Sequence, residues 1–61
     1  MRNWKVTLIF TDGDGKTYAI IKTEHVKQSP GEALTAAIDE SRQAFMDSKD
    51  IRYMQVSGIG E

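Results

Sequence analysis

The side chain best suited to proton transfer is His25, the only histidine of the chain. An imidazole titrates near neutral pH, and it can act as a general base when a hydroxyl and a carboxylate are arranged around it. Ser29 and Glu24 are close to His25 in the sequence. All three fall in a polar stretch that we interpret as a connector, with no pocket implied. We therefore expect no catalytic residue and no enzyme.

Two short strings resemble ligand sites without completing them. Gly15-Lys16-Thr17 resembles the end of a phosphate-binding loop, but the glycine required five residues before Gly15 is missing. Asp12 and Asp14 have the spacing of the first two calcium ligands, but the glycine and glutamate needed later in such a loop are also missing. Asp-Gly pairs are typical of turns. With one histidine and no cysteine, the sequence predicts no metal site and no cofactor.

Composition limits the class of protein. The chain has 61 residues, which is enough for one domain, and eight basic residues stand against nine acidic ones. This balance argues against a strongly basic nucleic-acid binder. The most apolar run, residues 6–10, is shorter than the about 7–15 residues of a secretory signal core or the about 20 of a membrane helix. We expect a cytoplasmic protein that does not bind membranes.

The first predicted structural element, which would position the side chains of any site, is a β-hairpin. Alternating apolar residues predict strands over 4–10 and 17–23, and the two Asp-Gly pairs between them predict a tight turn. A turn centred on Gly13-Asp14 would pair Thr11 with Lys16 and Val6 with Ile21. Cross-strand partners share a face of the sheet. One face would then carry the apolar core residues Trp4, Val6, Leu8, Phe10, Ala19 and Ile21.

A helix is predicted over 30–47, after a polar connector over 24–28. Ser29 and Glu32 have the spacing of a capping box, and Pro30 fits the first helical position. Lys49-Asp50 would close the helix. The inward face has residues at helical spacing. These are Leu34, Ala37, Ile38, Ser41, Ala44 and Phe45.

A last strand is predicted over 51–57, and its facing is ambiguous. We favour Met54 and Val56 inward, which leaves Ile51 and Tyr53 outward; the opposite register would bury Ile51 and Tyr53. Residues 58–61 are interpreted as a fraying tail. The fold class that follows is two-layer α+β with ββαβ order. Its antiparallel sheet has strand order 2-1-3, and the helix packs on one face.

The face of the sheet without the helix is the first candidate binding surface. Apolar side chains gather there more densely than on an ordinary solvent face. The partner-binding residues predicted on this face are Ile9, Tyr18, Ile20 and Tyr53, with Ile51 as a further candidate. The occupant could be a second copy of the chain or a different protein. It could also be nucleic-acid bases stacked on Tyr18 and Tyr53 beside Lys5 and Lys22.

The outer face of the helix is the second candidate binding surface. Residues 30–61 contain three basic and six acidic residues, whereas residues 1–29 contain five basic and three acidic ones. An acidic stripe can bind a basic groove by electrostatic complementarity. The partner-binding residues predicted on this stripe are Asp39, Glu40 and Asp47.

The order of the predicted strands and helix along this short chain resembles that of a group of small phage proteins. The matching features are a start, M-R-N-W-K-V, that leads directly into a strand, the T-D-G-D-G-K hairpin, and a helix capped by S-P-G-E before a final strand. In this format the chain resembles phage-encoded inhibitors of host defence or toxin proteins, of the anti-CRISPR or antitoxin kind. The resemblance implies a protein that binds a host protein and blocks it sterically. A nucleic-acid-binding regulator and a self-assembling structural protein are the alternatives.

Overall fold

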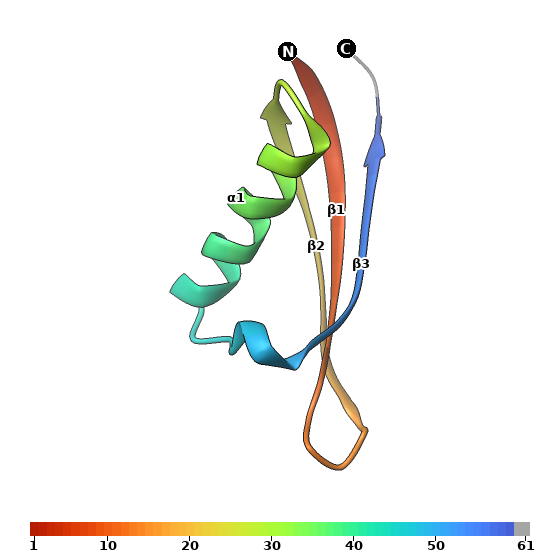
Figure 1. The fold of residues 1–61 in the computed structure, drawn as a ribbon, viewed down its shortest axis with the longest axis vertical. Helices are drawn as coiled ribbons and strands as arrows, with labels where there is room; N and C mark the ends of the chain where they lie inside the picture. Colours follow the sequence, from red (N-terminus) through yellow and green to blue (C-terminus); the bar gives the residue numbers. More distant parts are fainter. Residues whose placement is uncertain (60–61) are drawn as a thin grey trace.

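A computed structural model describes residues 1–59 (Figure 1). The three strands form an antiparallel sheet of order β2-β1-β3, and α1 packs on one of its faces. The predicted ββαβ architecture is confirmed. In chain order, the elements are β1 (Arg2–Thr11), β2 (Thr17–Lys27), α1 (Pro30–Gln43), the short 3-10 helix η1 (Ser48–Asp50) and β3 (Ile51–Gly58).

The hydrophobic core lies between β1 and α1. The central strand supplies the largest fully buried side chains, which are those of Val6, Leu8 and Phe10. The helix supplies the small buried residues Ala33 and Ala37. Small side chains on the helix let its backbone approach the sheet closely, so the large side chains of β1 fill the space between the layers.

The hairpin pairs two residues away from the predicted register. Asp12 Oδ1 accepts hydrogen bonds from the backbone N–H groups of Asp14 (2.9 Å) and Lys16 (3.0 Å), and Gly15 adopts a positive φ of 83°. This turn pairs Thr11 with Thr17, one residue beyond the predicted pair. A bulge then shifts the pairing by one more residue.

The core face of the hairpin is nevertheless the predicted one. Side chains alternate between faces with a period of two, so the displacement of two residues beyond the bulge keeps the side chains from Ala19 onward on their predicted faces. Val6 pairs with Thr23 and Leu8 pairs with Ile21, where the predicted partners were Ile21 and Ala19. The predicted pairs were wrong, and the assignment of the β1 core residues to the helix side was correct.

Strand β2 is longer than predicted and replaces most of the expected connector. It runs to Lys27 because Thr23 and His25 continue the alternation of the strand on its core face. The half-buried Trp4 stabilises this extension, since its Nε1–H donates to the carbonyl of Lys27 at 3.1 Å. His25 therefore lies on a strand and not on a connector.

Strand β3 combines the two facings that the sequence left open. Met54 pairs with Leu8 on the helix side and Tyr53 pairs with Ile9 on the opposite side, as favoured. Ile51 pairs with Phe10 and packs against the core, so its outward placement was wrong. The cause is a bulge at Arg52, which reverses the alternation.

The carboxyl end of β3 also departs from the prediction. Gly58 belongs to the strand, and the N–H of Ile59 donates to the carbonyl of Asn3 at 3.0 Å. The predicted fraying tail therefore does not begin at Gly58. Its last two positions, 60 and 61, lie outside the described residues.

Helix α1 begins as predicted and ends earlier. Ser29 is the N-cap, and its hydroxyl accepts from the N–H of Glu32 at 3.3 Å. The helix ends at Gln43 and not at 47. The N–H of Met46 donates to the carbonyl of Ser41 at 3.0 Å, which together with a positive φ at Phe45 forms a Schellman motif.

The early end of the helix changes which side chains reach the core. Ala37 and Ser41 are buried and Leu34 and Ile38 pack against the core, as predicted. Ala44 and Phe45 were predicted to face inward but are exposed, and Phe45 is 96% exposed. Met46 contributes apolar surface to the core at this end instead.

Candidate functional site

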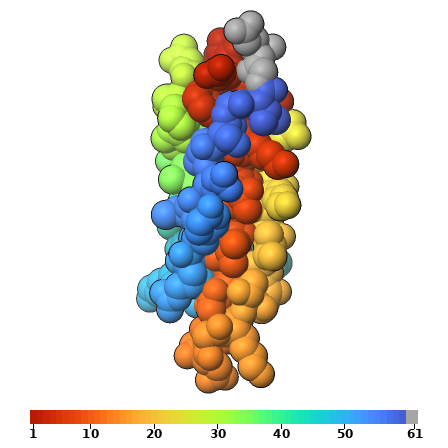
Figure 2. Space-filling model, turned by 90° about the vertical axis from the view of Figure 1, so that its right-hand side faces the viewer, coloured from red at the N-terminus to blue at the C-terminus, as the bar shows by residue number. Residues whose placement is uncertain are grey.

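An apolar row crosses the sheet on the face away from α1. Ile9 of β1 pairs with Ile20 of β2 on one side and with Tyr53 of β3 on the other. Ile20 and Tyr53 are 59% and 49% exposed, and Ile9 between them is half-buried. Figure 2 shows this face, where β3, β1 and β2 lie beside one another in front of the helix. The structure thus places together three of the four side chains predicted for this surface.

The apolar row forms one end of a shallow hollow of about 430 Å³, which we call the open-face hollow. Its other end is polar, because Lys22 pairs with Thr7 in the next row of the ladder and Lys5 pairs with Ser57 in the row after that. Rigid strands hold all of these side chains. The lining consists of Lys5, Thr7, Ile9, Ile20, Lys22, Tyr53, Gln55 and Ser57.

Tyr18 does not belong to this surface. Thr11 pairs with Thr17 and Phe10 pairs with Ala19, so Tyr18 is the extra residue of the β2 bulge. Its ring packs against that of the buried Phe10 at 6.2 Å between centroids, and its hydroxyl donates to Asp50 Oδ2 at 2.6 Å. A bulge re-aims a side chain in this way. The placement of Tyr18 beside Ile20 was therefore wrong.

The Tyr18–Asp50 contact predicts an unusual titration. The hydrogen bond to the Asp50 carboxylate, followed by desolvation and the negative charges nearby, raises the pKa of Tyr18 from 10.0 to about 12. Because the folded pKa lies above the unfolded one, the contribution of this contact to stability is complete below about pH 10 and is lost between about pH 10 and 12. Phenolate absorbance in a Tyr53→Phe background should rise near pH 12. An Asp50→Asn substitution should lower this pKa toward 10, and an unchanged titration curve would contradict the contact.

The acidic residues of the helix do not form one free stripe. Asp39 is exposed and lies 3.8 Å from the guanidinium of Arg42. Glu40 turns toward β2, and Asp47 lies beyond the helix, where its carboxylate caps η1 by accepting from the N–H of Lys49 at 2.9 Å. The predicted docking stripe therefore splits into three separate local contacts.

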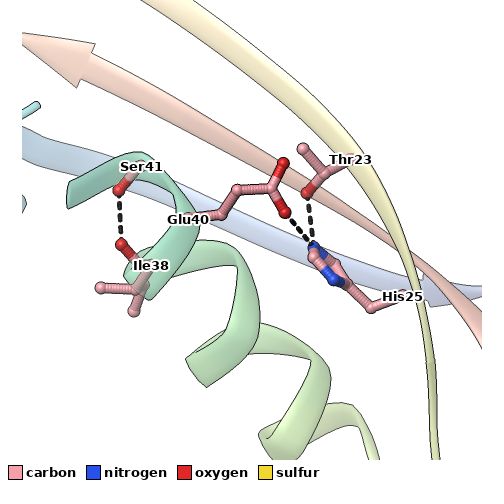
Figure 3. A network of polar contacts seen from close by, with 5 residues as sticks. All are labelled: Thr23, His25, Ile38, Glu40 and Ser41. Carbon is pink, nitrogen blue, oxygen red and sulfur yellow. Dashed lines mark hydrogen bonds and ion pairs between the residues drawn. The ribbon is translucent and has the colours of Figure 1, made fainter. Parts of the chain in front are cut away.

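A polar cluster joins the helix to β2 on the core side (Figure 3). His25 Nε2 lies 2.9 Å from Thr23 Oγ1 and 3.7 Å from Glu40 Oε2, and the His25 side chain is 11% exposed. The hydroxyl and the carboxylate approach the same ring nitrogen, whereas a nucleophilic triad needs them at opposite nitrogens. The cluster ties the carboxyl half of α1 to β2, and its geometry is not that of a catalytic triad.

The residues near His25 in the sequence do not join this cluster. Glu24 accepts from Asn3 Nδ2 at 3.1 Å, and Ser29 caps the helix. The sequence analysis did not predict the contact between His25 and Glu40, because His25 faces the helix only when β2 extends to Lys27. The alternation of Ile21, Thr23 and His25 was the signal that could have extended this strand.

Metal-ligand grouping and helix length also bear on the site. Among residues 1–59, no three His, Asp or Glu side chains are grouped as a metal ion would require. In the same range, no helix has both the length and the apolar character needed to cross a bilayer.

Comparison with known proteins gives the chain no family. No family model, no curated protein and no solved structure matches it significantly. The open-face hollow and its chemistry are therefore the basis for any functional argument.

Proposed function

We propose that the chain is a non-enzymatic protein-binding module that covers a surface of a partner protein with its open-face hollow. The observation that carries this proposal is the row of Ile9, Ile20 and Tyr53, which spans all three strands without a covering layer. Apolar and aromatic side chains on rigid strands contribute large contact area at little entropic cost, as interface anchors do.

The charges of the hollow suggest the chemistry of the partner. Lys5 and Lys22 line its polar end, together with Gln55 and Thr7. A partner surface with an apolar protrusion and an acidic rim would complement both ends. Steric blocking of a bacterial defence or toxin protein, the role implied by the resemblance to phage inhibitors, would use this surface.

Binding of single-stranded nucleic acid is the second candidate function. The observation that favours it is the exposed ring of Tyr53 in the same hollow as two lysines, since bases stack on aromatic rings beside basic side chains. Tyr18, the second ring predicted for stacking, lies against Phe10 instead. We therefore favour a protein partner.

The test compares two substitutions on β2. Ile20 and Val26 are both 59% exposed, but only Ile20 lines the hollow. Ile20→Lys should abolish the capture of a stoichiometric partner from nuclease-treated bacterial lysate, and Val26→Lys should leave it unchanged. Equal loss in both variants would contradict the assignment of the hollow. Salt-sensitive binding of labelled oligonucleotides that Ile20→Lys abolishes would favour the second candidate.

A further inference from the structure

The two edges of the sheet differ in how they are protected. An edge strand has a row of unpaired backbone N–H and C=O groups, and charged side chains normally prevent it from pairing with another chain. Strand β2 has three charged side chains, Lys22, Glu24 and Lys27, and one histidine, His25. Strand β3 has one charged side chain, Arg52, at its bulge. The β3 edge therefore has fewer charged side chains than the β2 edge.

The middle of β3 is exposed on both of its faces, whereas Ile51 and Val56 pack against the core. Tyr53 is 49% exposed on the open face, and its neighbour Met54 is 52% exposed on the helix side. Glu40 of α1 lies 3.7 Å from His25 of β2, and Met54 of β3 stays half-exposed on the helix side. Figure 1 shows the outer side of β3 free of other elements.

We propose that the β3 edge binds the β3 edge of a second copy of this chain, antiparallel, to form a continuous six-stranded sheet with both helices on the same side. A two-fold axis perpendicular to the sheet keeps each face continuous, so helix-side residues pair with helix-side residues. An axis at Met54 places the two Met54 side chains against each other and Tyr53 beside Gln55 of the second copy.

The charges permit this pairing. With the axis at Met54, Arg52 lies opposite Val56 of the second copy, and the two Arg52 positions are about 13 Å apart along the strands at about 3.3 Å per residue. That separation exceeds the Debye length of about 8 Å at physiological ionic strength. The same strand can thus meet its own copy without opposing like charges.

This inference is independent of the proposed function, because pairing through the edge leaves the open-face hollow uncovered. An edge of one strand is a small interface, so the dimer should dissociate in the micromolar to millimolar range. Sedimentation equilibrium over that range should give a mass that rises from 6.8 kDa toward twice that value. A constant monomer mass over the whole range would overturn the proposal.

The matched variants separate edge pairing from other association. Met54→Lys places a charge on the helix side of the edge and should weaken dimerisation at least tenfold, whereas Ile20→Lys should leave it unchanged. The circular dichroism spectra of both variants report that they are folded. If Met54→Lys dimerised as wild type does, the edge would not be the interface.

The absence of native cysteine allows a second readout that does not depend on the folding of the lysine variant. Met54→Cys should form a disulfide-linked dimer under oxidising conditions, because symmetric pairing brings the two residues together. Ile9→Cys at the centre of the open face should not. Preferential cross-linking of Ile9→Cys would show packing of sheet faces and would overturn edge pairing.

Discussion

Replacing Leu8 by alanine should cost about 2–5 kcal/mol of folding free energy, the range of such substitutions in packed cores. Leu8 is fully buried on the central strand, where it pairs with Ile21 on one side and Met54 on the other. A chain of this length has a total stability of about 3–9 kcal/mol at 0.05–0.15 kcal/mol per residue. Leu8→Ala should therefore remove a large part of the stability of the fold. A lower midpoint of chemical denaturation and a lower melting temperature than wild type would show this loss.

The matched control for this prediction is Ile20→Ala. Ile20 has the same number of side-chain carbons as Leu8 and also lies on a strand, but it is exposed on the opposite face of the sheet. Its truncation should cost less than about 1 kcal/mol, the span of strand propensities. Similar losses for the two variants would mean that the core does not lie between β1 and α1.

Replacing Phe45 by glycine should stabilise the protein by about 1 kcal/mol, because a side chain at a left-handed backbone conformation costs roughly 1–2 kcal/mol. Phe45 has a φ of 64° at the position after the helix cap where glycine is strongly preferred. Its ring is almost fully exposed, so its removal loses little burial. A gain of this size should raise the melting temperature by about 4–8 °C in a domain of this length.

Phe45→Ala distinguishes backbone strain from loss of the ring. Alanine removes the exposed aromatic group but keeps the Cβ atom that is unfavourable at positive φ, so this variant should melt close to wild type. If Phe45→Ala were stabilised as much as Phe45→Gly, the exposed ring and not the backbone would be the source of the destabilisation. If both variants lost several kcal/mol, Phe45 would be a core residue, as the helical spacing had predicted.

The sheet shows which structural features a sequence pattern can predict. The faces of the hairpin followed from the alternation of apolar residues, and they survived a register error of two because alternation repeats every two residues. The register itself depends on the turn at Asp12 and the bulge at Tyr18. A bulge inserts one residue with no periodic signature, so neither Tyr18 nor Ile51 could be assigned correctly from spacing.

The ends of the elements were harder to predict than their existence. Residues 44–47 have the composition of a continuing helix, and the helix ends at Gln43 because a Schellman motif forms there without its usual glycine. Residues 24–27 are mostly polar, yet they extend β2, and Trp4 stabilises this extension by donating to the carbonyl of Lys27. In both places a tertiary or capping contact outweighs the local sequence preference.

The part of the candidate site that was predicted correctly is the part in which the alternation of side chains along the strands decides which face each residue occupies. Ile9, Ile20 and Tyr53 lie in one row because each follows the regular pleat at its position. The acidic surface was not predictable in the same way. The direction of Glu40 depends on His25, and the role of Asp47 depends on the helix ending before it.

The central position of β1 has a consequence for the order of folding. Residues 12–16 join β1 to β2, whereas residues 28–50 separate β2 from β3. The entropic cost of closing a loop rises with the logarithm of its length, and hairpins form within about 1–10 μs. The hairpin can therefore form on its own first, leaving the other edge of β1 open until the helix has formed and β3 arrives from the far end of the chain.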